Sequence, residues 1–277
     1  MRVYTVDLKE KYAFLQGGNL ECILMDYPWD GEINPNWKRP AVVVVPGGGY
    51  GMVSKREGDP IASEFFANGF QAFVLTYEVA PNVAYPEQLL ELSAAVDYIR
   101  AHADEMNVNP DEIFVVGFSA GGHLTANLAV EYQSVSQKAG VALNSKPTAV
   151  GLAYPVISRL DGHVGSYDNL LNGYTEEAQA ELLKTLNLDQ AVTKDTPPAF
   201  IWTTAADSIV PSINSLHYAA ALANAGVEYE LHVHPRGDHG AATGSLEING
   251  YYPELVNIKG WIGECSRFFR MYTVEKM

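Results

Sequence analysis

Five short apolar runs, each bounded by turn-forming residues, recur along the 277-residue chain. They cover residues 41–45, 71–77, 113–116, 150–154 and 199–205. Continuous apolar runs of this length, rich in Val, Ile and aromatic residues, indicate strands that are buried on both faces. Such a sheet needs a covering layer on each side, so this feature narrows the choice of fold more than any other.

Helical periodicity fills the intervals between these runs. Apolar residues recur at 89, 92, 96 and 99 after Pro86, and from 255 to 272 after Pro253. A proline is tolerated in the first turn of a helix, so both positions are suitable starts. Strands that alternate with amphipathic helices predict an α/β fold with a mostly parallel, twisted central sheet and helices on both faces.

Two segments are predicted to form the edges of the sheet. No helical pattern separates residues 3–7 from residues 21–27, which favours an antiparallel hairpin at one edge. Apolar and polar residues alternate over 227–234, which predicts a half-exposed strand with its histidines on the polar face. We expect this last strand at the opposite edge.

Residues 158–195 break the alternation, because they hold polar loop residues and one weak helical pattern at 176–186. This stretch is too long for a simple connection inside a compact domain, so it predicts a small cap or lid. The whole chain, 1–277, is otherwise predicted to be a single catalytic domain.

Composition excludes several classes of partner. The formal charge of −15 disfavours a nucleic-acid partner, since that affinity comes from clustered Lys and Arg. Cys22 and Cys265 lack the CxxC spacing of a metal or redox site and are predicted to be buried thiols. The first residues lack a secretory apolar stretch, and no run approaches the roughly 18 apolar residues of a membrane span. We therefore expect a cytoplasmic protein without a membrane partner.

The stretch GFSAGGH, residues 117–123, directly follows the predicted strand at 113–116. A GxSxG sequence forms a sharp turn between a strand and a helix and exposes the serine oxygen, while its glycines prevent collisions with the neighbouring backbone. A serine hydroxyl is a poor nucleophile without an adjacent base. This pattern makes Ser119 a candidate nucleophile.

His239 is the preferred candidate base among seven histidines. It lies in PRGDHG, just past the last predicted strand, at the carboxyl end of the sheet where functional residues of open α/β sheets gather. His123 remains an alternative, although its place four residues after Ser119 on one helix should point it away from the serine oxygen. His163, in the predicted cap, is a candidate substrate contact.

The base needs a carboxylate that holds its tautomer. Asp207 directly follows the apolar run at 199–205 and meets this requirement. Asp238 is the alternative, but sequence neighbours such as Asp238 and His239 seldom share a side-chain hydrogen bond in an extended loop. The order Ser119, Asp207, His239 is the one expected for a hydrolase with a strand-to-helix nucleophile turn.

PGGGY, residues 46–50, closes the predicted strand at 41–45 with three glycines. Free backbone N–H groups at Gly48 and Gly49, joined by that of Ala120, would stabilise the oxyanion of a tetrahedral intermediate. The alternative interpretation is a tight glycine turn without a catalytic role. A phosphate-binding loop is excluded, because no GK[ST] follows.

These motifs together resemble the α/β-hydrolases of the esterase/lipase type, specifically the small acetyl-esterase group that includes xylan and carbohydrate esterases. The resemblance covers nearly the whole chain and rests on PGGGY, residues 56–70 (REGDP to ANGF), YIR at 98–100, GFSAGGH, YPVIS at 154–158, TPPAF at 196–200, DSIVP at 207–211 and GDHG. It implies a nucleophile at Ser119, an acid at Asp207, a base at His239 and an oxyanion hole near Gly48, Gly49 and Ala120. Pro46 departs from the HGGG pattern of related lipases, because it stands where those proteins have histidine.

The expected function is hydrolysis of short acyl esters, acetyl esters foremost, through an acyl-enzyme and without a cofactor or metal. The expected partner is a small-molecule ester, acetylated sugars included, and a homo-oligomer is left open. Two alternatives remain. A serine peptidase on the same fold usually carries a large extra domain, for which this chain has no length left. A ligand-binding homologue would keep the pocket without the chemistry.

Overall fold

The computed structural model describes residues 1–26, 37–250, 255 and 257–274. Within this part, eight strands form one sheet in the order β1-β2-β4-β3-β5-β6-β7-β8. The strands are β1 (Arg2–Asp7), β2 (Asn19–Leu24), β3 (Arg39–Val45), β4 (Gln71–Thr76), β5 (Val108–Phe118), β6 (Val150–Ala153), β7 (Ala199–Thr204) and β8 (Tyr229–His234). Strands β3 to β8 pair in parallel, whereas β2 is antiparallel to both β1 and β4. The five apolar runs became β3 to β7, which confirms the mostly parallel sheet.

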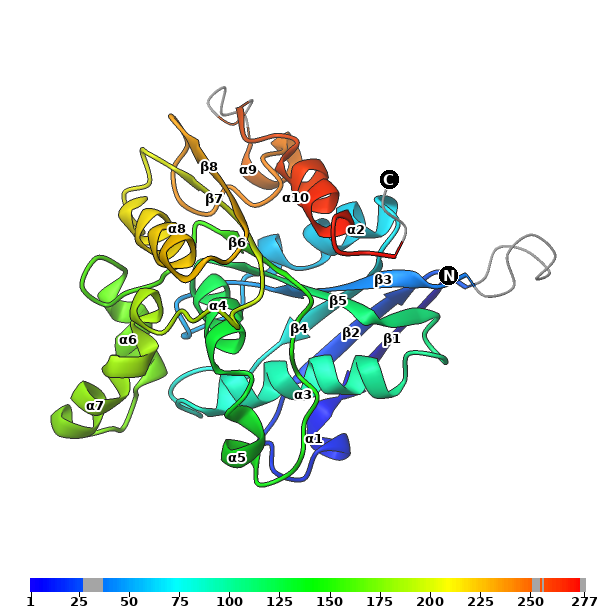
Figure 1. The fold of residues 1–277 in the computed structure, drawn as a ribbon, viewed down its shortest axis with the longest axis horizontal. Coiled ribbons are helices and arrows are strands. Elements are labelled where there is room, and N and C mark those ends of the chain that lie inside the picture. Colours follow the sequence, from blue (N-terminus) through cyan, green and yellow to red (C-terminus); the bar gives the residue numbers. More distant parts are fainter. Residues whose placement is uncertain (27–36, 251–254, 256, 275–277) are drawn as a thin grey trace.

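Helices cover both faces of the sheet, as predicted (Figure 1). One layer holds α3 (Glu87–Ala101), α4 (Ala120–Glu131), α5 (Val135–Ala139) and α8 (Ile213–Ala225), and the other holds α2 (Asp59–Ala67), α9 (Leu246–Asn249) and α10 (Trp261–Arg270). Successive valines of β3 alternate between the two layers: Val43 packs with the α3 and α4 residues, and Val42 with those of α2 and α10. The core is therefore two apolar layers separated by the sheet.

Two elements near the ends of the chain differ from the sequence interpretation. The hairpin of β1 and β2 is antiparallel as predicted, but a short helix, α1 (Leu8–Lys11), lies between the strands. The Asp7 carboxylate caps this helix by accepting hydrogen bonds from the N–H groups of Lys9 and Glu10. Within the helical pattern after Pro253, the α-helix that the structure describes is α10, which begins at Trp261. Tyr27 and Pro253 lie outside the described residues.

Strand β8 lies at the opposite edge and is half exposed, as predicted, but the face that carries its histidines is not the more exposed one. The rings of His232 and His234 face Phe200 and Trp202 at 5.2 Å and 6.0 Å between ring centroids. Tyr229 and Val233 are instead 40% and 41% exposed. The alternation of polar residues predicted that the histidine face would be the exposed one. This prediction was wrong because α10 packs over the histidine face of the strand.

Residues 158–195 contain two helices, α6 (Val164–Leu170) and α7 (Glu176–Leu186), and the 3-10 turn η2 (Leu188–Gln190). The span of α7 equals the predicted helix, and the Thr175 hydroxyl caps it by accepting from the N–H of Ala178. The sequence interpretation missed α6. Both helices lie beyond α4 and α8 at one side of the molecule (Figure 1).

Both cysteines, Cys22 and Cys265, are buried free thiols, as predicted. Among the described residues, no helix combines the length and apolar character required to cross a bilayer. The cytoplasmic location and the homo-oligomer stay predictions.

Phe269 provides a test of the layer beneath α10. Its fully buried ring stacks on Phe114 with 4.4 Å between centroids and also packs near Phe65 and Phe70. We expect Phe269→Ala to lower the free energy of unfolding by about 3–5 kcal/mol, because it leaves a cavity in a packed core. Urea unfolding measures this, with Leu160→Ala, at a position 80% exposed, as the control. A loss below about 1 kcal/mol would contradict the described packing.

Candidate active site

Ser119 occupies the turn between β5 and α4 in a conformation that few non-glycine residues adopt, with φ 52° and ψ −117°. The turn requires glycines on both sides. A Cβ at Gly117 would lie 2.2 Å from the Gly121 carbonyl oxygen, and one at Gly121 would lie 2.2 Å from that of Val45. The Ser119 N–H donates to the Ala153 carbonyl at 3.0 Å, which helps to hold the strained backbone.

The structure brings Ser119, His239 and Asp207 together. The Nε2 of His239 lies 2.8 Å from the Ser119 Oγ, and its Nδ1 lies 2.7 Å from the Asp207 Oδ2. The side chain of Asp207 is 1% exposed and that of His239 is 16% exposed. Asp207 follows β7 and His239 follows β8, so both come from the carboxyl ends of neighbouring parallel strands.

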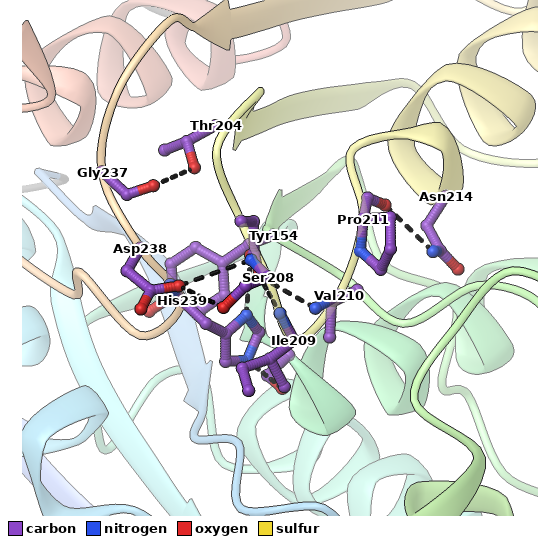
Figure 2. A network of polar contacts seen from close by, with 12 residues as sticks. Tyr154, Thr204, Ser208, Ile209, Val210, Pro211, Asn214, Gly237, Asp238 and His239 are labelled. Atoms are coloured by element: carbon purple, nitrogen blue, oxygen red, sulfur yellow. Dashed lines mark hydrogen bonds and ion pairs between the residues drawn. The ribbon is translucent and has the colours of Figure 1, made fainter.

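The other oxygen of Asp207 is fixed by the backbone. Its Oδ1 accepts hydrogen bonds from the N–H groups of Ile209 and Val210, at 2.9 Å and 2.8 Å. Figure 2 shows these two backbone nitrogens at the turn that precedes Pro211. With Oδ1 held in this way, Oδ2 stays directed at the imidazole and keeps the proton on Nδ1.

Asp238 takes a different role from Asp207. Its Oδ1 accepts from the Ser208 hydroxyl at 3.0 Å and from the backbone N–H of His239 at 2.9 Å (Figure 2). These hydrogen bonds, the one from the His239 N–H first, lower the pKa of Asp238. Asp238 thus orders the loop before the imidazole and does not hold the imidazole itself.

The alternative base, His123, points away from Ser119 and is buried. Its Nδ1 lies 2.8 Å from the Tyr50 hydroxyl and its Nε2 lies 3.1 Å from the Leu186 carbonyl oxygen. A carbonyl only accepts, so Nε2 carries the proton and Nδ1 accepts from Tyr50. Burial lowers the pKa of His123 to about 4. This imidazole is a neutral link between α4, the glycine loop and the end of α7.

The glycine loop after β3 presents free backbone donors. The Gly48 carbonyl accepts from the N–H groups of Gly51 and Met52, and Gly48 has φ 124°. No described residue accepts a hydrogen bond from the N–H of Gly48 or of Gly49. Ala120 is the first residue of α4, where an N–H has no partner within the helix. The N–H groups of Gly48 and Gly49 are therefore free of partners among the described residues, and Gly47, which precedes them, lies against the Ser119 side chain.

Residues outside the predicted catalytic set hold the glycine loop in place. The Asn169 Nδ2, on α6, donates to the Gly49 carbonyl at 2.8 Å. The Gly47 N–H donates to the Glu57 Oε2 at 2.9 Å. His163 is exposed, and its Cε1 would lie 3.9 Å from a Cβ built on Gly49, so the predicted cap segment reaches the loop. The one sequence signal for Glu57 was its place in REGDP.

Two spaces of very different size flank the site. A cavity of about 850 Å³ adjoins His239, and polar residues form much of its wall: Arg56, Ser208, Arg236, Asp238 and Asn249. Behind the glycine loop, a narrow space is too tight to admit a water molecule and is lined by Tyr50, His123, Val156, Ser166, Tyr167 and Leu170. In the described ranges, no three side chains of His, Cys, Asp or Glu gather closely enough to hold a metal ion.

The BD-FAE family model matches residues 33–222, which is more than half of the chain. The chain belongs to the BD-FAE family. It is 34% identical over 236 residues to endo-1,4-beta-xylanase B of Butyrivibrio fibrisolvens, covering 83% of this chain and 35% of the relative. It is 31% identical over 217 residues to the acetylxylan esterase of Xylanibacter ruminicola, covering 76% of this chain and 42% of that protein.

Among solved structures, the acetyl ester-xyloside bifunctional hydrolase of Caldicellulosiruptor lactoaceticus resembles this BD-FAE member over 98% of the chain and 96% of its own, with a TM-score of 0.81 and 30% identity. This match confirms the predicted α/β-hydrolase fold and the resemblance to acetyl-esterase relatives. The chain spans only about a third to two fifths of the length of the two curated relatives.

His123 gives a test of the site's electrostatics. Its folded-state pKa of about 4 lies below the ordinary 6.5, so the unfolded chain binds the proton first. The free energy of unfolding should therefore fall as the pH drops from 6.5 towards 4, by about 1.4 kcal/mol per unit. Between about pH 7.5 and 4.5, the free energy of unfolding measured in urea should fall by about 2–3 kcal/mol less in His123→Gln than in the wild type.

The control for this experiment is His102→Gln, which removes a histidine far from the glycine loop at the end of α3. Equal pH dependence in His123→Gln and the wild type would contradict a neutral, buried His123.

Proposed function

We propose that this BD-FAE family member is a serine carboxylesterase that removes short acyl groups, acetyl foremost, through an acyl-enzyme intermediate. The observation that carries the proposal is the continuous chain of hydrogen bonds from the Ser119 Oγ through the imidazole of His239 to the Asp207 carboxylate. A ligand-binding protein would have no use for a serine hydroxyl aimed at a base within 2.8 Å.

In the first half of the reaction, Ser119 attacks the carbonyl carbon of the ester while the His239 Nε2 takes the hydroxyl proton. Asp207 stabilises the imidazolium that forms. The N–H groups of Gly48, Gly49 and Ala120 donate to the oxyanion of the tetrahedral intermediate. When this intermediate collapses, the ester C–O bond breaks and His239 gives its proton to the leaving alcohol.

In the second half, a water molecule replaces the alcohol. His239 takes a proton from that water, whose oxygen attacks the acyl carbon bound to Ser119. A second tetrahedral intermediate uses the same backbone donors. Its collapse returns the proton to the Ser119 oxygen and releases the carboxylic acid, so the enzyme ends as it began and no cofactor is required.

The sizes of the two spaces support a small acyl group and a bulky, polar alcohol. The leaving group must lie on the His239 side, because His239 protonates it. The cavity of about 850 Å³ is on that side, and the polar side chains in its wall, Arg56, Arg236 and Asn249 among them, suit a ligand rich in hydroxyl groups, such as a sugar. The tight packing around Tyr50 and Tyr167 leaves little room behind the glycine loop. Relatives named acetylxylan esterase and acetyl ester-xyloside hydrolase favour the same substrate class.

In this proposal, residues 1–277 act as one catalytic domain and residues 158–195 serve as its cap. The contact from Asn169 to Gly49 supports the cap, because it places α6 against the glycine loop. The small size of this segment also argues against a long acyl tunnel.

Replacement of the nucleophile tests the mechanism. We expect Ser119→Ala to lower kcat for p-nitrophenyl acetate by at least about 10⁴-fold, and His239→Ala added to it to cost little more, because the residues act as a unit. Ser93→Ala, a buried serine on α3, is the matched control and should keep wild-type activity. Retention of most activity in Ser119→Ala would refute this role.

Acyl length tests the substrate class. Among p-nitrophenyl esters, kcat/KM should be highest for acetate and fall at least about tenfold by hexanoate, because each added methylene must be forced into packed side chains. A screen of acetylated xylosides follows the same logic on the alcohol side. A preference for hexanoate or longer chains would defeat the proposal of a small acyl site.

A further inference from the structure

The 3-10 turn η1 (Lys55–Glu57) lies between the glycine loop and the loop that carries His239. The neighbouring side chains of Arg56 and Glu57 extend from this turn, and each contacts one of the two loops. The Nη2 of Arg56 donates to the Gly240 carbonyl at 3.0 Å, directly after His239. Glu57 turns inward and is only 5% exposed. The triad itself uses neither residue, which raises the question of what a buried carboxylate does here.

Glu57 joins the glycine loop to a buried tyrosine. Its Oε2 accepts from the Gly47 N–H at 2.9 Å, and its Oε1 accepts from the Tyr154 hydroxyl at 2.7 Å. Gly47 is adjacent to Gly48, one of the free donors. A buried carboxylate without donors would be very costly, and these two hydrogen bonds satisfy one site on each oxygen.

Tyr154 carries the connection to the histidine loop. Its hydroxyl accepts from the Ala242 N–H at 3.1 Å while it donates to Glu57. Its ring meets that of His239 edge to face, with 5.0 Å between centroids, and Figure 2 shows the two side by side. Burial and the neighbouring Glu57 raise the pKa of Tyr154, so the phenol stays protonated and able to donate.

The far end of this chain is a strained residue. Ala242 has φ 49°, a conformation that L residues rarely adopt, and it lies three residues after His239. Its N–H is held by Tyr154 and its carbonyl accepts from the Trp261 Nε1 at 2.8 Å. Such strain persists only where the surroundings fix the backbone firmly. Loss of the Tyr154 hydrogen bond would free one of these two restraints.

We propose that Glu57 and Tyr154 form a brace that sets the position of His239 relative to the oxyanion donors. This inference rests on the proposed esterase function and deepens it. Both are positioning residues, because neither touches the reacting atoms. The brace runs from Gly47 through two buried side chains to Ala242, so it connects the two loops whose separation determines the reaction geometry. Displacements of about 1 Å at such sites can cost about 100-fold in rate.

The leaving group reveals which step the brace supports. An alkyl alcohol departs only when His239 protonates it, whereas p-nitrophenolate is stable enough to leave without a proton. A displaced His239 should therefore slow an alkyl acetate more than p-nitrophenyl acetate. A merely structural role would affect both substrates alike.

The decisive variant is Tyr154→Phe, which keeps the ring and removes both hydrogen bonds. We expect kcat/KM, which reports the acylation half of the reaction, to fall about 10- to 100-fold for ethyl acetate and less for p-nitrophenyl acetate. The matched control is Tyr218→Phe, which removes the hydroxyl of another fully buried tyrosine, one without a hydrogen-bond partner in the described structure. It should retain wild-type kcat/KM on both substrates.

Glu57→Gln keeps the shape of the side chain and provides a second route if Tyr154→Phe folds poorly. Because both residues belong to one chain of hydrogen bonds, the double variant should lose no more activity than the worse single variant. Additive losses in kcat/KM, equal losses in kcat/KM on the two acetates, or a kcat/KM for Tyr154→Phe like that of Tyr218→Phe would each overturn the brace.

A measurement without catalysis separates failure of the brace from failure of the esterase function. Hydrogen exchange of the peptide that contains Ala242 should be faster in Tyr154→Phe than in Tyr218→Phe, because Ala242 loses the acceptor for its N–H. Wild-type protein inactive on every acetate would sink the esterase proposal while this exchange still tests the brace. Unchanged exchange would overturn the brace even in an active enzyme.

Discussion

The rest of the site depends on the two hydrogen bonds of the His239 imidazole, which joins a hydroxyl on one side to a carboxylate on the other. Its partners are distant in sequence: Ser119 follows β5, Asp207 follows β7 and His239 follows β8. In a parallel sheet the carboxyl ends of all strands lie at the same end of the sheet, so three separate turns can meet there. The buried strands fix the positions of these turns, and the turns provide the catalytic groups.

The geometry of this edge is maintained against backbone strain. Tyr50, Ser119, Tyr154 and Ala242 all have positive φ without being glycines, and all lie in or beside the site. Each is restrained by a neighbour: Tyr50 by His123, Ser119 by Ala153, Tyr154 by Trp202, and Ala242 by Tyr154 and Trp261. Strain of about 1–3 kcal/mol per residue is sustained only by such surrounding contacts. The packed layers around β3 and β5 thus act on the reaction geometry as well as on stability.

Sequence patterns could predict what depends on local chemistry. Apolar runs identified β3 to β7, and glycine-rich turns identified Ser119 and the loop at Gly48 and Gly49. Sequence patterns did not predict features that depend on contacts between residues distant in the sequence. The histidine face of β8 is covered because α10 packs over it, and Glu57 meets Tyr154 across 97 positions. The helices α1 and α6 are too short for a clear periodic signal. Nothing local in REGDP shows which of its charges turns inward.

The proposed mechanism requires that the Ser119 oxygen becomes covalently acylated. Rapid acid quenching of a reaction with p-nitrophenyl acetate, followed by mass spectrometry of the digested protein, detects this intermediate. We expect one added acetyl group on the peptide that contains Ser119, and none on that peptide in Ser119→Ala. Turnover without any acetylated Ser119 peptide, or an acetyl group that persists in Ser119→Ala, would contradict it.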